Sequence, residues 1–294
     1  MKSFLLLSVL MIGTAAFATF AADGIVKTGA QSSRFSAKPV ALRLRSSAVL
    51  VIAQDSGEQL FAKNVDQVMP IASITKLMTA MVVHDSGLPL LETIEISNDD
   101  IDRRKGSHSK LQVGTNLMRA EMLKLALMAS ENRAAASLAR NFPGGTDAFV
   151  AAMNQKAAEL GMTNSRFEDP TGLTPNNVST AEDLVKMVAA AHTYPLIREY
   201  TTSDSFKIES EDKRRRRLLS YGNSNRLIKS RQWDIGLSKT GYISEAGRCL
   251  VMQAMIAEKP VIIVLLDSWG KLSRIADANR IKHWIETDVL RVSG

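Results

Sequence analysis

Three apolar segments near the C-terminal end place the strongest limit on the fold. They span residues 237–242, 248–257 and 261–267, and each has the length and apolar content of a β-strand. In the second and third segments, apolar residues occupy both alternating positions, which is typical of strands covered on both faces. The chain must therefore supply a protein layer on each side of a sheet.

The other predicted elements fit such a layered domain. Two further strands are expected at residues 47–53 and 59–62. Helical periodicity covers much of the middle, and we expect helices at residues 73–86, 121–129, 134–140, 146–160 and 179–191, with a last one at 272–290. Thr146 is predicted to cap the helix at 146–160, and Ser179 with Glu182 to form a capping box for the helix at 179–191. Strands at both ends of the sequence indicate an α+β fold, with one antiparallel sheet flanked by the terminal helix and by a helical subdomain.

The N-terminus has the pattern of an export signal. Lys2 precedes an apolar run at residues 4–12, and Ala16-Phe17-Ala18 matches a cleavage site. We therefore expect a signal peptide, a flexible lead-in and one domain, at residues 1–22, 23–45 and 46–292 respectively. No other stretch is apolar for long enough to span a membrane, so no transmembrane anchor is expected after cleavage.

The chain is basic, with a formal net charge of +7 at pH 7, and an unbroken basic run extends from Lys213 to Arg217. Residues 201–235 are polar and basic, and we expect loops and a short hairpin there. We interpret the run itself as a solvated loop; the alternative is a loop attracted to an anionic polymer of the cell envelope. No nucleic-acid partner is expected, because no aromatic residues interleave with the run and the chain carries an export signal.

The segment 70–77 suggests a serine nucleophile. Ser73 and Lys76 are three residues apart at the start of a predicted helix, so both side chains lie on one helix face. In a dry site, a lysine ammonium can lose its proton and then deprotonate the hydroxyl. The helix N-terminus adds partial positive charge where an oxyanion would form. Taken alone, Ser-x-x-Lys is more often a capping serine and a solvated lysine, so the hypothesis needs support from elsewhere in the chain.

Two further motifs supply that support. Ser130 and Asn132 lie at the end of a predicted helix, whereas Lys239, Thr240 and Gly241 lie on a predicted strand. Ser130 can relay a proton to a leaving nitrogen, and Asn132 can hydrogen-bond a substrate amide. Lys239 and Thr240 offer a positive charge and a hydroxyl to a carboxylate, and Gly241 allows a substrate backbone to approach closely.

In this order, Ser-x-x-Lys, Ser-x-Asn and Lys-Thr-Gly resemble the signature of penicillin-binding proteins and serine β-lactamases. Residues 70–80, 169–173, 239–242 and 247–250 look like the D-alanyl-D-alanine carboxypeptidase/endopeptidase family, and the resemblance covers about residues 45–290. It is closest to the penicillin-binding protein 7 type of D-alanyl-D-alanine endopeptidase, because neither a second β-rich domain nor an amphipathic C-terminal anchor is visible. The resemblance implies a β-lactamase/transpeptidase-like fold, with residues 46–292 as a serine DD-peptidase domain.

The resemblance also implies roles for individual residues. Ser73 would attack the carbonyl carbon of a D-Ala residue and form an acyl-enzyme, with Lys76 as general base and Ser130 as proton relay. The substrate would be bound by Asn132, Lys239, Thr240, Gly241 and Tyr242. The backbone N–H groups of Ser73 and Tyr242 would form the oxyanion hole. Neither a metal ion nor another cofactor is implied.

The implied substrates are peptidoglycan stem peptides in the periplasm, and the implied covalent inhibitors are β-lactams. Endopeptidase activity on crosslinks is favoured over removal of a terminal D-Ala by a carboxypeptidase. A class A β-lactamase would need a deacylating glutamate, for which Glu168 is the candidate, but Asp169-Pro170-Thr171-Gly172 after it look like the peptidase loop. The intact motifs argue against an inactive wall-binding protein.

Overall fold

The computed structural model describes residues 42–212 and 215–289. The predicted signal peptide (1–22) and most of the predicted lead-in (23–45) lie outside the described residues, so both remain predictions. None of the helices formed by the described residues is both long and apolar enough to cross a membrane.

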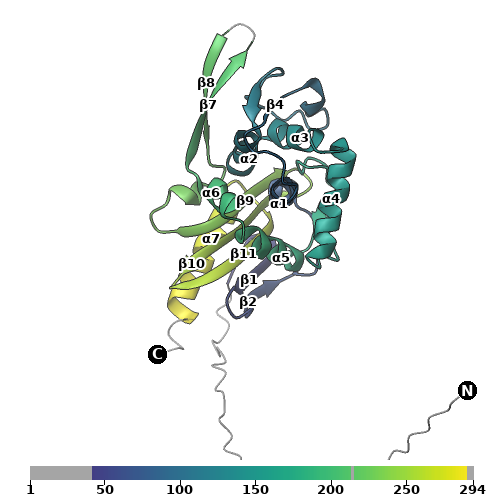
Figure 1. Cartoon of the computed structure of the whole chain (residues 1–294). Coiled ribbons are helices and arrows are strands. Elements are labelled where there is room, and N and C mark those ends of the chain that lie inside the picture. The colour runs from purple at the N-terminus through teal and green to yellow at the C-terminus, as the bar shows by residue number, and fades with distance from the viewer. Residues whose placement is uncertain (1–41, 213–214, 290–294) are drawn as a thin grey trace, which may run out of the picture. The chain divides into compact units, whose positions relative to one another are not determined.

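One five-stranded antiparallel sheet forms the centre of the fold, as predicted (Figure 1). Its strand order is β2-β1-β11-β10-β9, so the two N-terminal strands extend the sheet that the three C-terminal strands begin. The bounds are β1 Ser46–Ala53, β2 Gln59–Lys63, β9 Asp234–Ile243, β10 Gly247–Ile256 and β11 Lys259–Ser268. Strand β9 lies at one edge of this sheet, so the side of β9 that faces away from β10 pairs with no other strand of the sheet.

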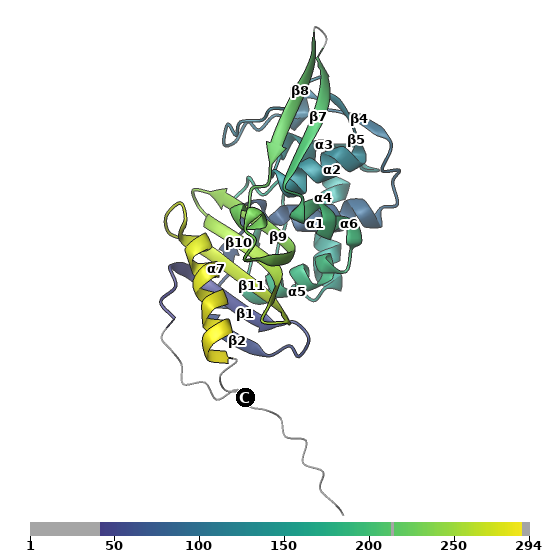
Figure 2. The ribbon, with the colours of Figure 1, turned by 90° about the vertical axis from the view of Figure 1, so that its left-hand side faces the viewer.

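Both faces of the sheet are covered, because its apolar side chains alternate between two cores. Val49 and Leu265 pack with Ile281 of α7 (Ser273–Trp284), the terminal helix, on one face. Leu50 and Val264 pack on the other face, in the core shared with the helical middle of the chain. Figure 2 shows α7 lying across the sheet on its own side, followed by the π-helix η4 (Ile285–Val289).

The helical middle packs on the other face of the sheet. Its helices are α1 Lys76–Asp85, α2 Arg119–Met128, α3 Asn132–Arg140, α4 Gly145–Glu159, α5 Ala181–His192 and α6 Pro195–Thr202. Three short 3-10 turns lie between the longer elements: η1 Ala72–Thr75, η2 Asn98–Asp100 and η3 Arg226–Lys229. Two short antiparallel strand pairs accompany them. Strand β3 (Met69–Pro70) pairs with β6 (Val178–Ser179), and β4 (Thr93–Glu95) pairs with β5 (Asn116–Met118). The α6 helix was not predicted, although Pro195 stands at its first position, where proline favours a helix start.

Two predicted helix caps are wrong. Helix α4 begins at Gly145 after a left-handed Gly144, so Thr146 lies inside the helix. Helix α5 is capped by Thr180, whose side chain accepts from the N–H of Asp183 at 3.1 Å, instead of by Ser179. The reason is that Ser179 still belongs to β6, where it pairs with Met69.

A β-hairpin occupies residues 205–222, within the region where a short hairpin was expected, and it includes part of the basic run that was predicted to be a solvated loop. Strands β7 (Ser205–Asp212) and β8 (Arg215–Gly222) pair along their whole length and project beyond the helical middle (Figures 1 and 2). Residues 213 and 214 lie outside the described residues, whereas Arg215–Arg217 begin β8. Apolar residues such as Ile208, which is buried, alternate with polar ones in β7, and this alternation favours a strand.

Candidate active site

Ser73 lies in η1, immediately before α1 begins at Lys76. The Lys76 side chain is completely buried, and its Nζ donates to Ser73 Oγ at 2.9 Å. The three-residue spacing therefore brings the amine and the hydroxyl together, as predicted.

Burial of Lys76 favours a neutral amine, whereas its hydrogen-bond acceptors favour the ammonium. Its Nζ also donates to Asn132 Oδ1 at 2.7 Å and to the carbonyl oxygen of Thr171 at 2.6 Å. Burial lowers the pKa of Lys76 from its usual value to about 7, while the charges of Asp169 and Glu131 oppose that shift. Near neutral pH, a large fraction of the lysine is therefore unprotonated and able to accept the proton of a hydroxyl.

A second serine–lysine pair lies beside the first. Ser130 occupies the junction between α2 and α3 in a left-handed conformation, with φ 62°. Its Oγ accepts from Lys239 Nζ at 2.9 Å, and that Nζ also donates to the carbonyl oxygen of Thr240. Burial, followed by the nearby charges of Lys76 and Arg274, lowers the pKa of Lys239 well below its usual value. The edge strand β9 and the helical middle thus meet at Ser130.

Strand β9 also packs directly against the turn that carries Ser73. A Cβ added to Gly241 would lie 2.9 Å from the carbonyl oxygen of Ile71 and 3.0 Å from the backbone nitrogen of Ser73. Glycine is needed here because the strand backbone approaches η1 so closely. Thr240 Oγ1 donates to Ser224 Oγ at 2.8 Å, and Tyr242, the next residue after Gly241, is exposed.

The loop 168–174 supplies the Thr171 carbonyl group, which the sequence did not predict as part of the site. The Asp169 carboxylate accepts from the N–H groups of Thr171, Gly172 and Thr174 at 2.5 to 2.8 Å. Gly172 has φ +79°, and a Cβ there would lie 2.0 Å from the carbonyl oxygen of Ala72. The loop is therefore folded on its own aspartate and pressed against η1.

All predicted site residues are brought into one region by these contacts: Ser73, Lys76, Ser130, Asn132, Lys239, Thr240, Gly241 and Tyr242. Asn132 differs from the expectation, because its side chain bonds within the protein, to Lys76 and to Ser107 Oγ. Ser107 and Ser224 are further members that the sequence did not indicate. Within residues 42–212 and 215–289, no group of three or more His, Cys, Asp or Glu side chains is arranged to hold a metal ion.

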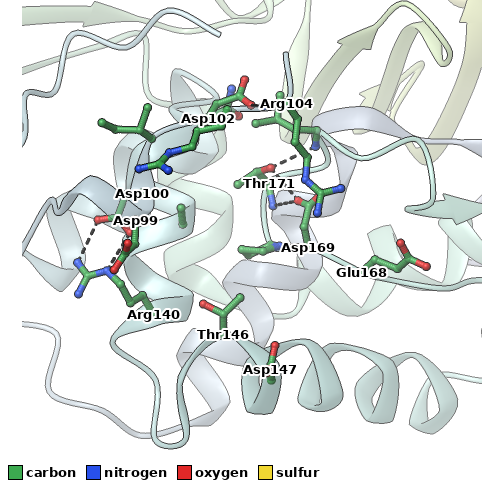
Figure 3. A pocket seen from close by; sticks show the side chains of 16 residues that line it. Asp99, Asp100, Asp102, Arg104, Arg140, Thr146, Asp147, Glu168, Asp169 and Thr171 are labelled. Atoms are coloured by element: carbon green, nitrogen blue, oxygen red, sulfur yellow. Dashed lines mark hydrogen bonds and ion pairs between the residues drawn. The ribbon is translucent and has the colours of Figure 1, made fainter. Parts of the chain in front are cut away.

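A cavity of about 540 Å³ adjoins this site (Figure 3). Asn132 and Thr171 line it and also accept hydrogen bonds from Lys76, so the cavity adjoins the Ser73–Lys76 pair through these two residues. Glu168 lines the cavity too, but its carboxylate pairs with Arg166 at 2.7 Å and accepts from Asn176. Those two contacts commit the Glu168 carboxylate to Arg166 and Asn176.

Comparison with known proteins identifies the family. The family model described as D-alanyl-D-alanine carboxypeptidase (Peptidase S11) matches residues 33–270. The chain belongs to this family. Its relatives include the D-alanyl-D-alanine endopeptidase of Pseudomonas aeruginosa, 48% identical over 249 residues, which are 85% of this chain and 80% of that protein. The D-alanyl-D-alanine endopeptidase of Escherichia coli is 42% identical over 268 residues, which are 91% and 84% of the two chains.

The fold agrees with the family assignment. A crystal structure of a Streptomyces DD-transpeptidase superposes with a TM-score of 0.77 and 27% identity, covering 82% of this chain and 97% of that one. The predicted transpeptidase-like α+β fold is therefore confirmed, and so is the predicted membership of the D-alanyl-D-alanine peptidase family.

Proposed function

We propose that the protein is a serine DD-peptidase that hydrolyses the peptide crosslinks of peptidoglycan at the carbonyl group of a D-Ala residue. The observation that carries the proposal is the buried Lys76 amine, 2.9 Å from Ser73 Oγ and with a pKa of about 7. A lysine in this state can activate a serine without a histidine. The endopeptidase names of the two relatives above 40% identity support cleavage of crosslinks.

In the acylation step, neutral Lys76 takes the proton of Ser73 as Oγ attacks the carbonyl carbon of the D-Ala residue. The N–H groups of Ser73 and Tyr242 stabilise the oxyanion, and losing one such donor costs roughly 10²–10³ in rate. The closeness of Gly241 to the Ser73 nitrogen supports this pairing of donors, because the Tyr242 N–H follows directly in the chain.

In the departure step, Ser130 delivers a proton to the leaving amine as the C–N bond breaks, and Lys76 returns to Ser130 the proton that it took from Ser73. The contact between Ser130 and Lys239 supports this role, because Lys239 Nζ donates to Ser130 Oγ and so leaves the proton of the Ser130 hydroxyl free to pass to the leaving amine. Lys239 and Thr240 bind the carboxylate beside the leaving nitrogen. Water then attacks the ester carbon, releases the acyl peptide and restores the Ser73 hydroxyl.

The periplasm is the proposed location, since peptidoglycan lies there and residues 1–22 have the pattern of a signal peptide. Penicillins are proposed to acylate Ser73 in the same way as the substrate and to be released slowly. The position of Glu168, paired with Arg166, argues against rapid β-lactamase turnover.

Two measurements test the function. Fluorescent penicillin should label the wild-type protein and fail to label Ser73→Ala. Purified crosslinked muropeptide dimers should be converted to monomers. If the dimers persist while pentapeptides become tetrapeptides, the protein is a carboxypeptidase, the activity that names its family.

A further inference from the structure

An ion pair joins the two parts of the molecule that form the active site. Lys105 Nζ, in the loop 102–107 of the helical middle, donates to the carboxylate of Glu245, in the turn between β9 and β10. This hydrogen bond lowers the pKa of Glu245 to about 2, so the carboxylate is charged near neutral pH. Among the described residues, no other hydrogen bond or ion pair connects this loop to this turn. The pair takes no part in the reaction steps proposed above.

The loop that carries Lys105 is tied to the helical side of the nucleophile. The Asp102 carboxylate accepts from three backbone N–H groups of the loop at 2.8 to 3.0 Å, so the loop has a defined shape. Ser107 Oγ accepts from the Asn132 amide at 3.0 Å. Asn132 in turn accepts from Lys76, the partner of Ser73. The loop is therefore connected to the serine–lysine pair through Asn132.

The turn that carries Glu245 is tied to the other side of the nucleophile. It follows β9, and Gly241 of that strand packs directly against the backbone nitrogen of Ser73. The carbonyl oxygen of Gly241 also accepts from Arg274 of α7 at 2.9 Å, which fixes this end of β9 on the sheet. The two residues of the ion pair therefore approach each other from opposite sides of Ser73.

Together these contacts form a closed ring beside the nucleophile. The ring runs through Ser73, Lys76, Asn132, Ser107, Lys105 and Glu245 and returns to Ser73 along β9. Lys76 is completely buried, whereas the side chains of Lys105 and Glu245 are 29% and 40% exposed. Exposed ion pairs contribute little to stability, so this link of the ring is the one that opens most readily.

The order of the groups along β9 indicates which part of the substrate meets the ring. Lys239 and Thr240 are assigned to the carboxylate beside the leaving nitrogen, and the N–H of Tyr242 to the oxyanion. A substrate that lies along β9 therefore has its leaving group at residues 239–240. Its acyl part continues past Tyr242, toward Glu245. The donor stem of a crosslink consequently runs toward the ion pair.

We propose that the donor stem passes through this ring, and that the Lys105–Glu245 ion pair is a strap that opens to admit the stem and closes over it. In a crosslinked wall, the donor stem is joined to a glycan chain at one end and to the acceptor stem at the other. Such a stem has no free end to thread through a closed ring, so the strap opens each time a crosslink enters. This inference rests on the proposed peptidase function and adds a gating step to it.

A covalent tether in place of the ion pair tests the strap. In Lys105→Cys/Glu245→Cys, a bis-maleimide of matching length joins the two introduced thiols, whereas N-ethylmaleimide caps each thiol separately. The native Cys249 is buried and should stay unmodified, which mass spectrometry checks. The substrate is isolated peptidoglycan sacculi, in which each crosslink is attached to glycan on both sides. Release of new amino groups measures the cleavage.

The tethered protein should lose cleavage of sacculi, whereas the capped protein should retain it. Acylation of Ser73 by penicillin should be equal in the two forms, because a small unattached molecule enters a closed ring without threading. The matched control is Asp204→Cys/Lys229→Cys with the same two reagents. It replaces an exposed ion pair between the start of β7 and η3, and its tethered form should cleave sacculi as fast as its capped form.

Equal cleavage of sacculi by the tethered and capped forms of Lys105→Cys/Glu245→Cys would overturn the strap and leave the peptidase function standing. A tether that also abolishes penicillin acylation would overturn it too, because the bridge would then obstruct the nucleophile for every ligand. If the wild-type protein is neither acylated by penicillin nor able to cleave sacculi, the peptidase function fails, and the strap fails with it.

Discussion

At the scale of single residues, the protonation of Lys76 should control the rate of acylation. Burial places its pKa at about 7, and only the neutral amine can accept the Ser73 proton. The acylation rate with a penicillin should therefore rise with pH through a midpoint near 7 and level off above it. Lys76→Arg should lower the plateau by roughly 10²–10⁴, because a guanidinium stays protonated. A pH-independent rate in the wild-type protein would contradict the assignment of the base.

Glu131 provides a second, independent test of the same lysine. Its charge raises the pKa of Lys76, so removing the charge should lower that pKa. In Glu131→Gln, the amide oxygen can still accept from the N–H of Arg133 at the start of α3, as the carboxylate does. The midpoint of the acylation profile should therefore move to lower pH. Glu182→Gln, an exposed acid in α5, is the matched control, and a profile that shifts equally in both variants would refute the local effect.

The sequence predicted the side chains of the site better than the backbone groups that complete it. Ser73, Lys76, Ser130 and Lys239 could be predicted because their chemistry lies in their residue types and spacing. The acceptor at Thr171 is a carbonyl group, which every residue carries, so no residue type marks it. Its position depends on how the loop 168–174 folds around Asp169, and local spacing does not determine that.

At the scale of elements, the close contact between the loop 168–174 and η1 should make Gly172 intolerant of a side chain. Gly172→Ala combines a left-handed backbone with a Cβ 2.0 Å from the Ala72 carbonyl oxygen. We expect the free energy of unfolding to fall by about 3 kcal/mol or more, measured by urea denaturation. Gly57→Ala is the control, since its φ is +71° but nothing lies within 4 Å of the added Cβ. It should cost about 1 kcal/mol. Equal losses in the two variants would exclude close packing as the cause.

Long periodic elements could be predicted, whereas the residues that cap their helices could not. The strands and the helix behind Ser73 appear with nearly the predicted bounds because their apolar periodicity reflects burial. The cap of α5 was assigned to Ser179 because Glu182 follows it at capping-box spacing, although the neighbouring Thr180 is also a good capping residue. Pairing of Ser179 with Met69, a partner far away in the sequence, decides between them. Tertiary contacts therefore determine where the helix begins.

At the scale of the whole molecule, the two-sided sheet could be predicted because β10 and β11 are apolar at both alternating positions. The hairpin β7–β8 was harder to predict, because its apolar alternation is mixed with charged residues. The sheet and the helical middle meet at β9, and the site lies at this contact. Lys76 and Lys239 are both buried at that contact, and burying an ionisable amine lowers the free energy of unfolding of the whole protein.

That destabilisation should depend on pH in a predictable direction. In the unfolded chain Lys76 has an ordinary pKa of about 10.4, whereas in the folded protein its pKa is about 7. Between these values the unfolded state binds a proton that the native state lacks, so raising the pH favours the native state. The destabilisation is fully present below pH 7 and disappears toward pH 10. Lys76→Met removes this dependence and also the charge that lowers the pKa of Lys239.

The free energy of unfolding of Lys76→Met minus that of the wild-type protein should therefore decrease as pH rises, by up to about 1.4 kcal/mol per pH unit between pH 7 and pH 10. Urea denaturation of both proteins at pH 6, 7.5 and 9 measures this difference. Lys229→Met is the matched control, because it removes one ammonium from an exposed lysine of η3. A difference that is constant across these pH values would mean that Lys76 is protonated in the native state throughout. The amine could not then act as the base for Ser73, so this stability measurement tests the mechanism without any substrate.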